Sequence, residues 1–210
     1  QAKKLPDCEL IDVNNEKHKV FVDYLKKRSI DPTRNKFYVT PDDEGRNNNR
    51  VIIPFTYNNE IVGHTSRYLD DRKPKFITEN QQVGYVFGYD FQKPEWQVCI
   101  LVEGIFDALS IDGCALTHNN ISPEQAQLLR QLNRQIIMVP DRDKPGLEIC
   151  ETALNLGYSV SLPDWESDIK DVNDAVIRYG KVPTLLSILQ NATTSKIKIE
   201  MRRKQIVKGL

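Results

Sequence analysis

Acidic side chains gather at two points of the chain where an apolar run gives way to a helical pattern. Glu103 directly follows the apolar run 97–102, and Asp107 comes four residues later, so both can face one cleft. Asp141 and Asp143 follow another apolar run, and residues i and i+2 of an extended chain point the same way. Clustered carboxylates raise one another's pKa and are costly unless cations neutralise them. The spacing therefore predicts a cation-binding group of acids.

Asp171 follows a further apolar run, so a third strand end contributes an acid to this group, with Asp168 and Asp174 nearby. Hard oxygen ligands select Mg²⁺ or Mn²⁺. Two such ions about 4 Å apart stabilise both the attacking and the leaving oxygens of an in-line phosphoryl displacement. The sequence thus predicts phosphoryl transfer with two or more divalent ions. We assign catalysis to Glu103, Asp107, Asp141 and Asp143, and metal binding to Glu103, Asp141, Asp143 and Asp171.

Each acid also has a simpler interpretation when it is taken alone. An isolated Asp-x-Asp is typical of a loop whose aspartates cap a helix, and Glu103 can serve as a favourable negative charge at a helix N-terminus. At single positions these alternatives stay open. The joint placement of the acids after alternating strands favours the metal site.

The elements expected around the acids alternate strand and helix four times from residue 97 onward. This order predicts a mostly parallel sheet covered by helices, with functional residues at the carboxyl ends of the strands. Ser122, Pro123 and Gln125 have the spacing of a helix N-cap with a capping box. We expect strands at 97–102, 114–116, 135–139 and 158–162, and helices at 106–110, 122–132, 145–156 and 172–179.

The first ninety or so residues predict a separate α+β lobe. A short amphipathic helix is expected at 20–28, and strands are expected at 50–55 and 60–64, joined by a turn at Asn58 and Asn59. The polar stretch 42–49 predicts an exposed loop.

The remaining tail is basic, and its apolar residues fit neither the helical nor the strand period, so no element is assigned there. We divide the chain into a basic N-terminal α+β lobe at 1–95, a catalytic domain at 96–180 and a basic C-terminal segment at 181–210.

The composition of the chain limits which classes of protein it can belong to. The chain holds 29 Lys+Arg against 29 Asp+Glu, but residues 77–190 hold 16 acidic against 8 basic side chains, between two basic flanks. An acidic centre beside basic flanks suits divalent cations next to a polyanion; a solvated surface is the alternative. No apolar run is long enough to span a membrane, and the four cysteines form no Cys-x-x-Cys pair. We therefore expect a cytoplasmic protein with reduced thiols.

Two segments resemble the motifs of Toprim proteins. Residues 102–107 read Val-Glu-Gly-Ile-Phe-Asp, similar to the family's Glu-Gly-x-x-Asp motif. Residues 141–146 read Asp-Arg-Asp-Lys-Pro-Gly, similar to its Asp-x-Asp-x-x-Gly motif. Toprim proteins include primases, topoisomerases, small nucleases and recombination proteins, so these motifs alone do not choose among them.

The N-terminal lobe resembles that of DnaG-type DNA primases. Residues 24–28 are similar to the family's Tyr-Leu-x-x-Arg-Gly segment, and residues 50–55 to its Arg-Val-hydrophobic-x-Pro strand. Residues 61–67 resemble Val-x-Gly-x-x-x-Arg, and residues 73–76 resemble Pro-Lys-Tyr. The matches run in order from about residue 20 to about residue 180, which makes the chain similar to the RNA polymerase domain of bacterial and phage primases.

This resemblance implies an α/β fold, in which a Toprim domain with a mostly parallel sheet flanked by helices is preceded by a smaller α+β lobe. It implies a DNA-directed RNA polymerase, a nucleotidyltransferase that makes short RNA primers from ribonucleoside triphosphates on single-stranded DNA with Mg²⁺ or Mn²⁺. A replicative helicase and a zinc-binding domain outside this chain are the implied partners, in a bacterial or phage-infected cell. The residues expected to bind nucleotide or nucleic acid are Arg28, Arg50, Arg67, Arg72, Lys73 and Lys75.

The chain departs from the family pattern beside Asp171, where Asn173 stands in place of a second acid, as in phage primases and primase-helicases. Two other functions use the same features. A Toprim nuclease or a topoisomerase-like fragment would cleave phosphodiesters with the same acids, and a non-catalytic nucleic-acid-binding module would lack them. The acids are present and the basic lobe is primase-like, so we favour the primase.

Overall fold

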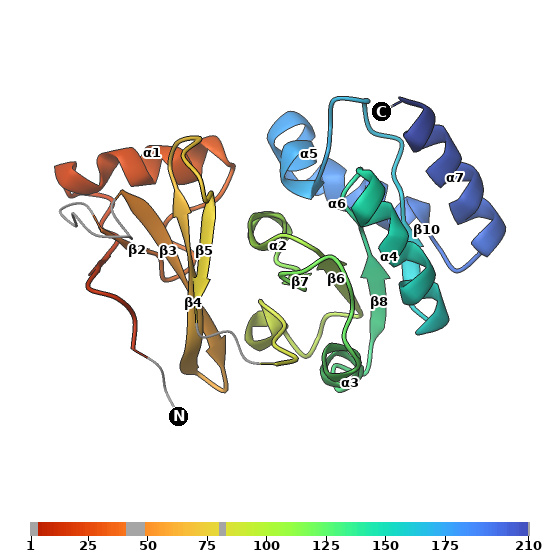
Figure 1. Ribbon diagram of the computed structural model, residues 1–210, viewed down its shortest axis with the longest axis horizontal. Coiled ribbons are helices and arrows are strands. Elements are labelled where there is room, and N and C mark those ends of the chain that lie inside the picture. The colour runs from red at the N-terminus through yellow and green to blue at the C-terminus, as the bar shows by residue number, and fades with distance from the viewer. Residues whose placement is uncertain (1–3, 41–48, 80–82, 210) are drawn as a thin grey trace. The chain divides into compact units, whose positions relative to one another are not determined.

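The computed structural model describes residues 4–40, 49–79 and 83–209, and the chain divides into two compact units between Val83 and Gly84 (Figure 1). This boundary lies before the expected one at residue 95. Residues 84–95 belong to the second unit because Phe87 and Ala115 exchange two backbone hydrogen bonds of 2.9 Å and Val86 lies in that unit's core. The C-terminal segment, expected to be separate, also belongs to the second unit.

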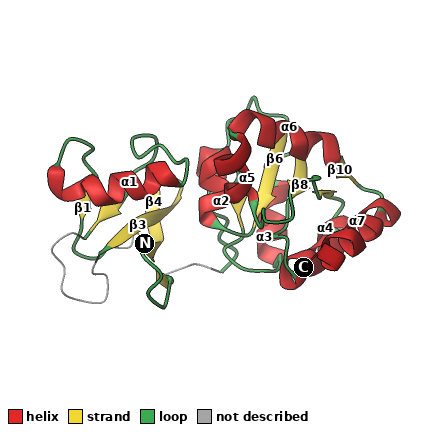
Figure 2. Ribbon diagram, turned by 90° about the horizontal axis from the view of Figure 1, so that it is seen from above, coloured by secondary structure: helices red, strands yellow, loops and turns green. Residues whose placement is uncertain are grey.

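The first unit is an antiparallel sheet with the strand order β1-β2-β3-β4-β5, overlaid by helix α1 (Lys19–Lys27) (Figure 2). The expected turn at Asn58 and Asn59 is confirmed, because both residues have the positive φ that tight hairpin turns require, 52° and 63°. The expected loop at 42–49 lies outside the described residues except for Asn49. The strands are β1 (Glu9–Leu10), β2 (Tyr38–Val39), β3 (Arg50–Tyr57), β4 (Glu60–Tyr68) and β5 (Phe76–Glu79), and a 3₁₀ helix, η1 (Glu16–His18), precedes α1.

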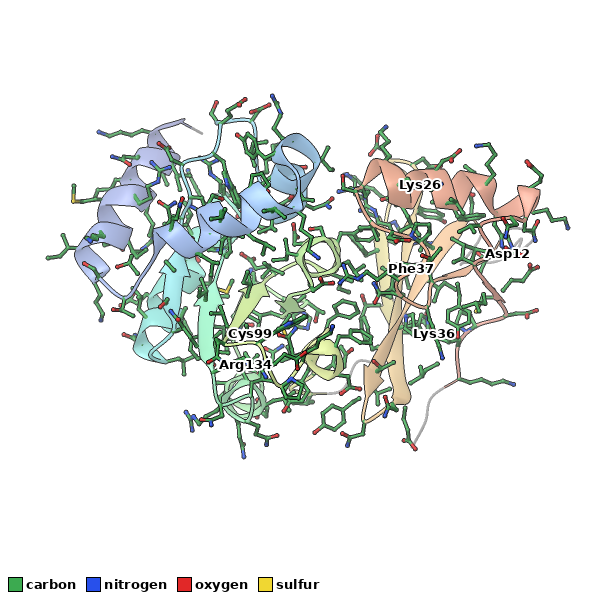
Figure 3. All side chains as sticks on the ribbon, turned by 180° about the vertical axis from the view of Figure 1, so that it is seen from behind. Asp12, Lys26, Lys36, Phe37, Cys99 and Arg134 are labelled. Carbon is green, nitrogen blue, oxygen red and sulfur yellow. The ribbon has the colours of Figure 1, made fainter. Side chains whose placement is uncertain are left out.

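The second unit contains the predicted parallel sheet, with the strand order β10-β9-β8-β6-β7. Strands β7, β6, β8 and β9 run parallel, and only the short edge strand β10 is antiparallel. Cys99 lies inside this unit on strand β6 (Figure 3), and the four cysteines form no disulfide in this structure. The strands are β6 (Val98–Val102), β7 (Cys114–Ala115), β8 (Gln135–Met138), β9 (Ser159–Ser161) and β10 (Ala192–Thr193).

Helices cover both faces of this sheet (Figures 1 and 2). Helices α2, α5 and α6 pack together on one face, and α3, α4 and α7 lie on the other. The predicted capping box at Ser122 and Gln125 is confirmed at the start of α3. The helices are α2 (Ile105–Ile111), α3 (Pro123–Arg130), α4 (Lys144–Asn155), α5 (Val172–Tyr179), α6 (Lys181–Asn191) and α7 (Lys196–Gly209), with a 3₁₀ helix, η2 (Tyr89–Phe91), before β6.

The tail left unassigned by the sequence is helix α7. Its Ile199 and Ile206 are seven residues apart and enter the core beside α4, whereas Ile197 and Met201 are exposed. Apolar residues thus lie on both sides of α7, which explains why no helical period is visible in the sequence. Among the residues that the structure describes, no helix is long and apolar enough to cross a bilayer.

Candidate active site

The five predicted acids all lie at the carboxyl ends of parallel strands in the second unit. Glu103 follows β6, and Asp107 lies in the first turn of α2. Asp141 and Asp143 follow β8, while Asp171 ends the loop that follows β9. Because β6, β8 and β9 are parallel neighbours, all five acids are delivered to one edge of the sheet, as the sequence predicts.

The two motif glycines leave space that the acids occupy. A Cβ atom on Gly146 would lie 2.8 Å from Glu103 Oε1 and 2.5 Å from the carbonyl oxygen of Asp141. A Cβ atom on Gly104 would overlap Asp107 Oδ2. Gly104 itself has an ordinary extended backbone with φ −93°, so a sharp turn is not what requires glycine there. Both glycines are therefore needed for close approach to a carboxylate.

Backbone amides fix two of the acids. Glu103 Oε1 accepts a hydrogen bond of 3.0 Å from the backbone N–H of Asp141, which ties the loop after β6 to the loop after β8. Asp107 is buried, and its Oδ1 accepts a hydrogen bond of 2.7 Å from the backbone N–H of Asn173. Asn173 thus supports Asp107 through its main chain.

Asp143 and Asp171 cap helices, which is the simpler interpretation that the sequence left open. Asp143 Oδ1 accepts a hydrogen bond of 2.7 Å from Gly146 N at the start of α4, and Asp171 Oδ1 accepts one of 2.7 Å from Asp174 N at the start of α5. Within residues 4–40, 49–79 and 83–209, no three His, Cys, Asp or Glu side chains are arranged to hold one ion. Coordination by three or more acids therefore requires side chains to rotate from the positions seen here.

The acids nevertheless influence one another strongly. Burial, and then the neighbouring negative charges of Glu103 and Asp171, raise the pKa of the Asp141 carboxyl to about 8. Burial, and then the charge of Asp171, also raise the pKa of Asp107 well above its ordinary value, and burial raises the pKa of Glu103. The described ion pairs do not include Glu103, Asp107 or Asp141. The edge of the sheet therefore gathers carboxyl groups that repel one another when ionised, and this set of oxygen donors fits Mg²⁺ or Mn²⁺.

The segment that carries the five acids is similar to a known protein family. Residues 100–176, which include all five acids, match the family model described as Toprim-like. The DNA primase of Clostridium acetobutylicum is 25% identical over 167 residues, which cover 70% of this chain and 27% of that primase.

Solved primase structures match across most of the chain. A DnaG primase catalytic domain bound to single-stranded DNA has a TM-score of 0.72 at 18% identity, covering 92% of this chain and 78% of that chain. The Escherichia coli primase catalytic core has a TM-score of 0.67 at 19% identity, covering 86% and 75%. This chain contains a Toprim-like domain and has the fold of the DnaG primase catalytic core. The predicted fold class is confirmed.

In this DnaG-like core, one predicted nucleic-acid contact is misplaced. Arg50 is fully buried, and its guanidinium donates hydrogen bonds to the carbonyl oxygens of Ser66 at 3.0 Å, Lys75 at 3.3 Å and Pro74 at 2.9 Å. It also stacks at 3.4 Å on the ring of Tyr68. Arg50 therefore joins β3 to the segment before β5 and is not available to nucleic acid.

Two other arginines of the first unit meet at one aromatic residue. Arg67 on β4 is buried, and its Nε donates a hydrogen bond of 2.9 Å to the hydroxyl of Tyr24 on α1. Its guanidinium also lies 4.6 Å above the ring of Phe76. Arg28, at the end of α1, lies 5.9 Å from the ring of the same Tyr24. Arg28 and Arg67 thus form one basic cluster built on Tyr24.

The remaining side chains predicted to bind nucleic acid are exposed, and two of them form surface ion pairs. Lys73 is exposed, Arg72 pairs with Asp70 at 2.9 Å, and Lys75 pairs with Asp71 at 3.6 Å. Solvent-exposed pairs of this kind contribute little stability. A phosphate can therefore replace these carboxylates at small cost.

Sequence analysis missed Arg142, the middle residue of the Asp-x-Asp segment. Its guanidinium donates hydrogen bonds to the carbonyl oxygens of Trp165, Glu166 and Ile169 in the loop before Asp171. A cation between two acids is visible in the sequence, but backbone carbonyls more than twenty residues away leave no pattern to detect.

Proposed function

We propose that this chain is the catalytic core of a DNA primase, which synthesises short RNA primers on single-stranded DNA by metal-dependent nucleotidyl transfer. The observation that carries the proposal is the delivery of five acids to one edge of a Toprim-like sheet within a DnaG-type core. The chain spans 27% of the length of the curated primase that it matches. The activity is therefore proposed for this core.

The acids that would hold divalent cations are Glu103, Asp141, Asp143 and Asp171. Bound Mg²⁺ or Mn²⁺ supplies charge neutralisation for the triphosphate and lowers the pKa of a primer 3′-hydroxyl. These acids are close enough to repel one another, which contributes to the raised pKa of Asp141, and a bound cation would relieve that repulsion.

The chain's own residues fix where this charge lies. The hydrogen bond from Asp141 N sets the orientation of the Glu103 carboxylate. Asp107 accepts a hydrogen bond from Asn173 N, and burial and then the charge of Asp171 raise its pKa well above the ordinary value. These contacts hold Glu103 and Asp107 in place, while coordination of one ion by three or more acids would still require side chains to rotate.

The basic side chains of the first unit supply phosphate contacts in this proposal. Arg28, which is only partly buried, presents a guanidinium group suited to bidentate phosphate binding, whereas Arg67 is buried and supports it by holding Tyr24. The exposed Arg72, Lys73 and Lys75 suit sequence-independent contacts with the template backbone, which weaken as salt is added. Single-stranded DNA and ribonucleoside triphosphates are therefore the proposed ligands.

A zinc-binding domain and a helicase are the proposed partners outside these residues. The solved Aquifex aeolicus primase contains zinc-binding and RNA polymerase domains, and this chain matches 64% of it with a TM-score of 0.63. The primase fragment of the bacteriophage T7 primase-helicase protein matches with a TM-score of 0.53.

Glu103→Gln is expected to abolish RNA synthesis by this chain. The substitution removes the negative charge from a carboxylate that faces the loop after β8, while an amide oxygen can still accept the hydrogen bond from Asp141 N. Incubation with single-stranded DNA, four ribonucleoside triphosphates and Mn²⁺ should give alkali-labile oligoribonucleotides with the unsubstituted chain. We expect at least about a hundredfold less product with Glu103→Gln, because even residues that only support metal ligands contribute 10- to 100-fold.

The same samples, with supercoiled plasmid in place of template, distinguish the alternative. A Toprim nuclease would nick the plasmid in a Glu103-dependent manner and make no RNA. That result would exclude the primase proposal and retain a phosphodiester-cleaving site.

A further inference from the structure

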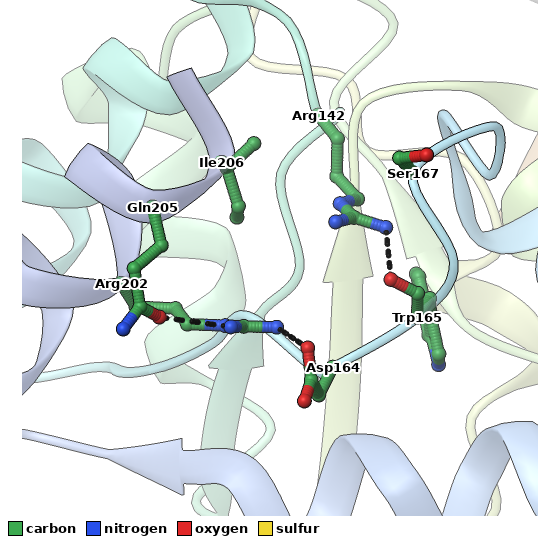
Figure 4. Close-up of a pocket in the computed structure, with 7 residues that line it drawn as sticks. All are labelled: Arg142, Asp164, Trp165, Ser167, Arg202, Gln205 and Ile206. Carbon is green, nitrogen blue, oxygen red and sulfur yellow. Dashed lines mark hydrogen bonds and ion pairs between the residues drawn. The ribbon is translucent and has the colours of Figure 1, made fainter. Parts of the chain in front are cut away.

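The loop 162–171 connects β9 to α5 and ends on Asp171, and arginines from two other elements hold it (Figure 4). Arg142 comes from the loop after β8, and Arg202 comes from α7. Both side chains line one cavity of about 210 Å³ together with Asp164 and Trp165 of the loop. The position of Asp171 therefore depends on contacts from outside its own segment.

Arg142 ties this loop directly to the Asp-x-Asp segment. Its Nη1 atom donates to three carbonyl oxygens, those of Trp165 at 3.1 Å, Glu166 at 2.9 Å and Ile169 at 3.2 Å. Its backbone N–H donates to the carbonyl oxygen of Lys170 at 2.7 Å. The side chain and the backbone N–H of Arg142 together donate to four carbonyl oxygens of the segment 165–170, just before Asp171.

Arg202 holds the start of the same loop from α7. Its Nε donates to the carbonyl oxygen of Leu162 at 3.1 Å, and its Nη2 donates to that of Pro163 at 3.1 Å and to the Asp164 carboxylate. The two arginines together hold the loop at both ends. This arrangement costs free energy of folding for two reasons. The two positive charges line the same cavity, and Arg142 Nε is buried without an acceptor among the described residues.

Other contacts keep the loop folded without these arginines. Arg178 on α5 pairs with Glu166 at 3.2 Å and Asp168 at 2.6 Å, and the indole N–H of Trp165 donates to Ser187 Oγ on α6 at 2.9 Å. Loss of Arg142 should therefore shift the loop near Asp171 and leave the fold intact.

We propose that Arg142 is a positioning residue for the divalent-cation site: it sets Asp171 against Asp141 and Asp143, and Arg202 extends this support to α7. The proposal rests on the proposed function, because it assumes that these acids bind a cation. Residues that orient metal ligands typically contribute 10- to 100-fold to metal affinity. Arg142 is placed to act in this way because its own neighbours on both sides are acids of the site.

Calorimetric titration of the full chain with Mn²⁺ tests the proposal. Arg142→Gln should weaken Mn²⁺ binding by at least about tenfold, Arg202→Gln should weaken it in the same direction, and Arg142→Lys should recover part of the loss because an ammonium group donates to several carbonyls. The matched control is Arg134→Gln. Arg134 (labelled in Figure 3) also donates to loop carbonyls, those of Lys93 at 2.8 Å and Leu132 at 3.3 Å, but it precedes β8 at the end opposite to the acids.

Thermal unfolding of each variant, measured without metal, separates positioning from general loss of structure. Unchanged Mn²⁺ affinity in Arg142→Gln and Arg202→Gln would overturn this inference and leave the proposed function standing. An equal loss in Arg134→Gln would also overturn it. If the unsubstituted chain binds no Mn²⁺, the proposed function fails, and the inference fails with it.

Discussion

Replacing Asp141 with Asn should eliminate RNA synthesis and at the same time stabilise the metal-free protein. Asp141 lies among the other acids. Its negative charge raises the pKa of Asp107, and the charges of Glu103 and Asp171 raise its own pKa. Without its carboxylate the edge of the sheet loses charge where the cation is proposed to bind, so we expect at least about a hundredfold loss of synthesis. The same change removes repulsion from the metal-free fold.

The sign of the stability change follows from the pKa of Asp141, which burial and neighbouring acids raise from 3.8 to about 8. A raised pKa gives a contribution to stability that is present below the ordinary value and is lost as the pH rises toward 8. In a chelating buffer, the midpoint temperature of the unsubstituted chain should therefore fall as the pH rises from about 4 to about 8. The fall should be smaller in Asp141→Asn.

Thermal scans of both proteins across this pH range measure the effect. We expect Asp141→Asn to unfold several degrees higher at pH 8, since each kcal/mol shifts the midpoint by about 2–4 °C in a chain of this length. Identical pH profiles for the two proteins would show that Asp141 is not under electrostatic strain, and active Asp141→Asn would show that it is not needed.

Replacing Arg50 with Met should destabilise the first unit strongly. Methionine retains much of the side-chain volume but leaves the carbonyl oxygens of Ser66, Pro74 and Lys75 without the donors that they have in the native fold. Hydrogen bonds to a charged group contribute about 1.5–3 kcal/mol each, and unsatisfied buried groups add to the loss. We expect a decrease of about 3 kcal/mol or more in the free energy of unfolding, measured by denaturant titration.

Arg72→Met is the matched control for this prediction. Arg72 stacks on the same Tyr68 ring at 4.4 Å, but it is exposed and pairs only with Asp70. It should weaken binding of single-stranded DNA at low salt and leave the unfolding transition in place. If Arg50→Met were as stable as Arg72→Met but deficient in DNA binding, Arg50 would be a nucleic-acid contact after all.

The parts of the fold that the sequence predicts are those determined by local chemistry. The capping box at Ser122 and Gln125 and the paired asparagines at 58–59 specify their conformation within a few residues, and both are seen in the structure. The alternation of buried strands with helices places the acids on one sheet edge because parallel strands end on the same side.

The parts that the sequence does not predict depend on contacts between distant segments. Arg50 has the same appearance in the sequence as the exposed Arg72, but contacts with β4 and with the segment before β5 surround its side chain. Helix α7 enters the core through two residues seven positions apart, which is too sparse for a periodicity signal. Phe87 joins the second unit through a bridge to Ala115, a contact between segments that lie far apart in the sequence.

Asp143 is where the two interpretations of the acids compete directly. Its Oδ1 caps α4, so its conformation alone is that of an ordinary helix-capping aspartate. Asparagine caps helices about as well as aspartate does, but it lacks the charge. Asp143→Asn therefore preserves the structural role and removes the proposed functional one.

The rate of Mn²⁺-dependent ribonucleotide incorporation by Asp143→Asn on single-stranded DNA distinguishes a metal ligand from a helix cap. We predict at least about a hundredfold loss of rate, with a thermal midpoint close to that of the unsubstituted chain. A rate equal to that of the unsubstituted chain would show that Asp143 serves only as a helix cap and would contradict the proposed metal centre.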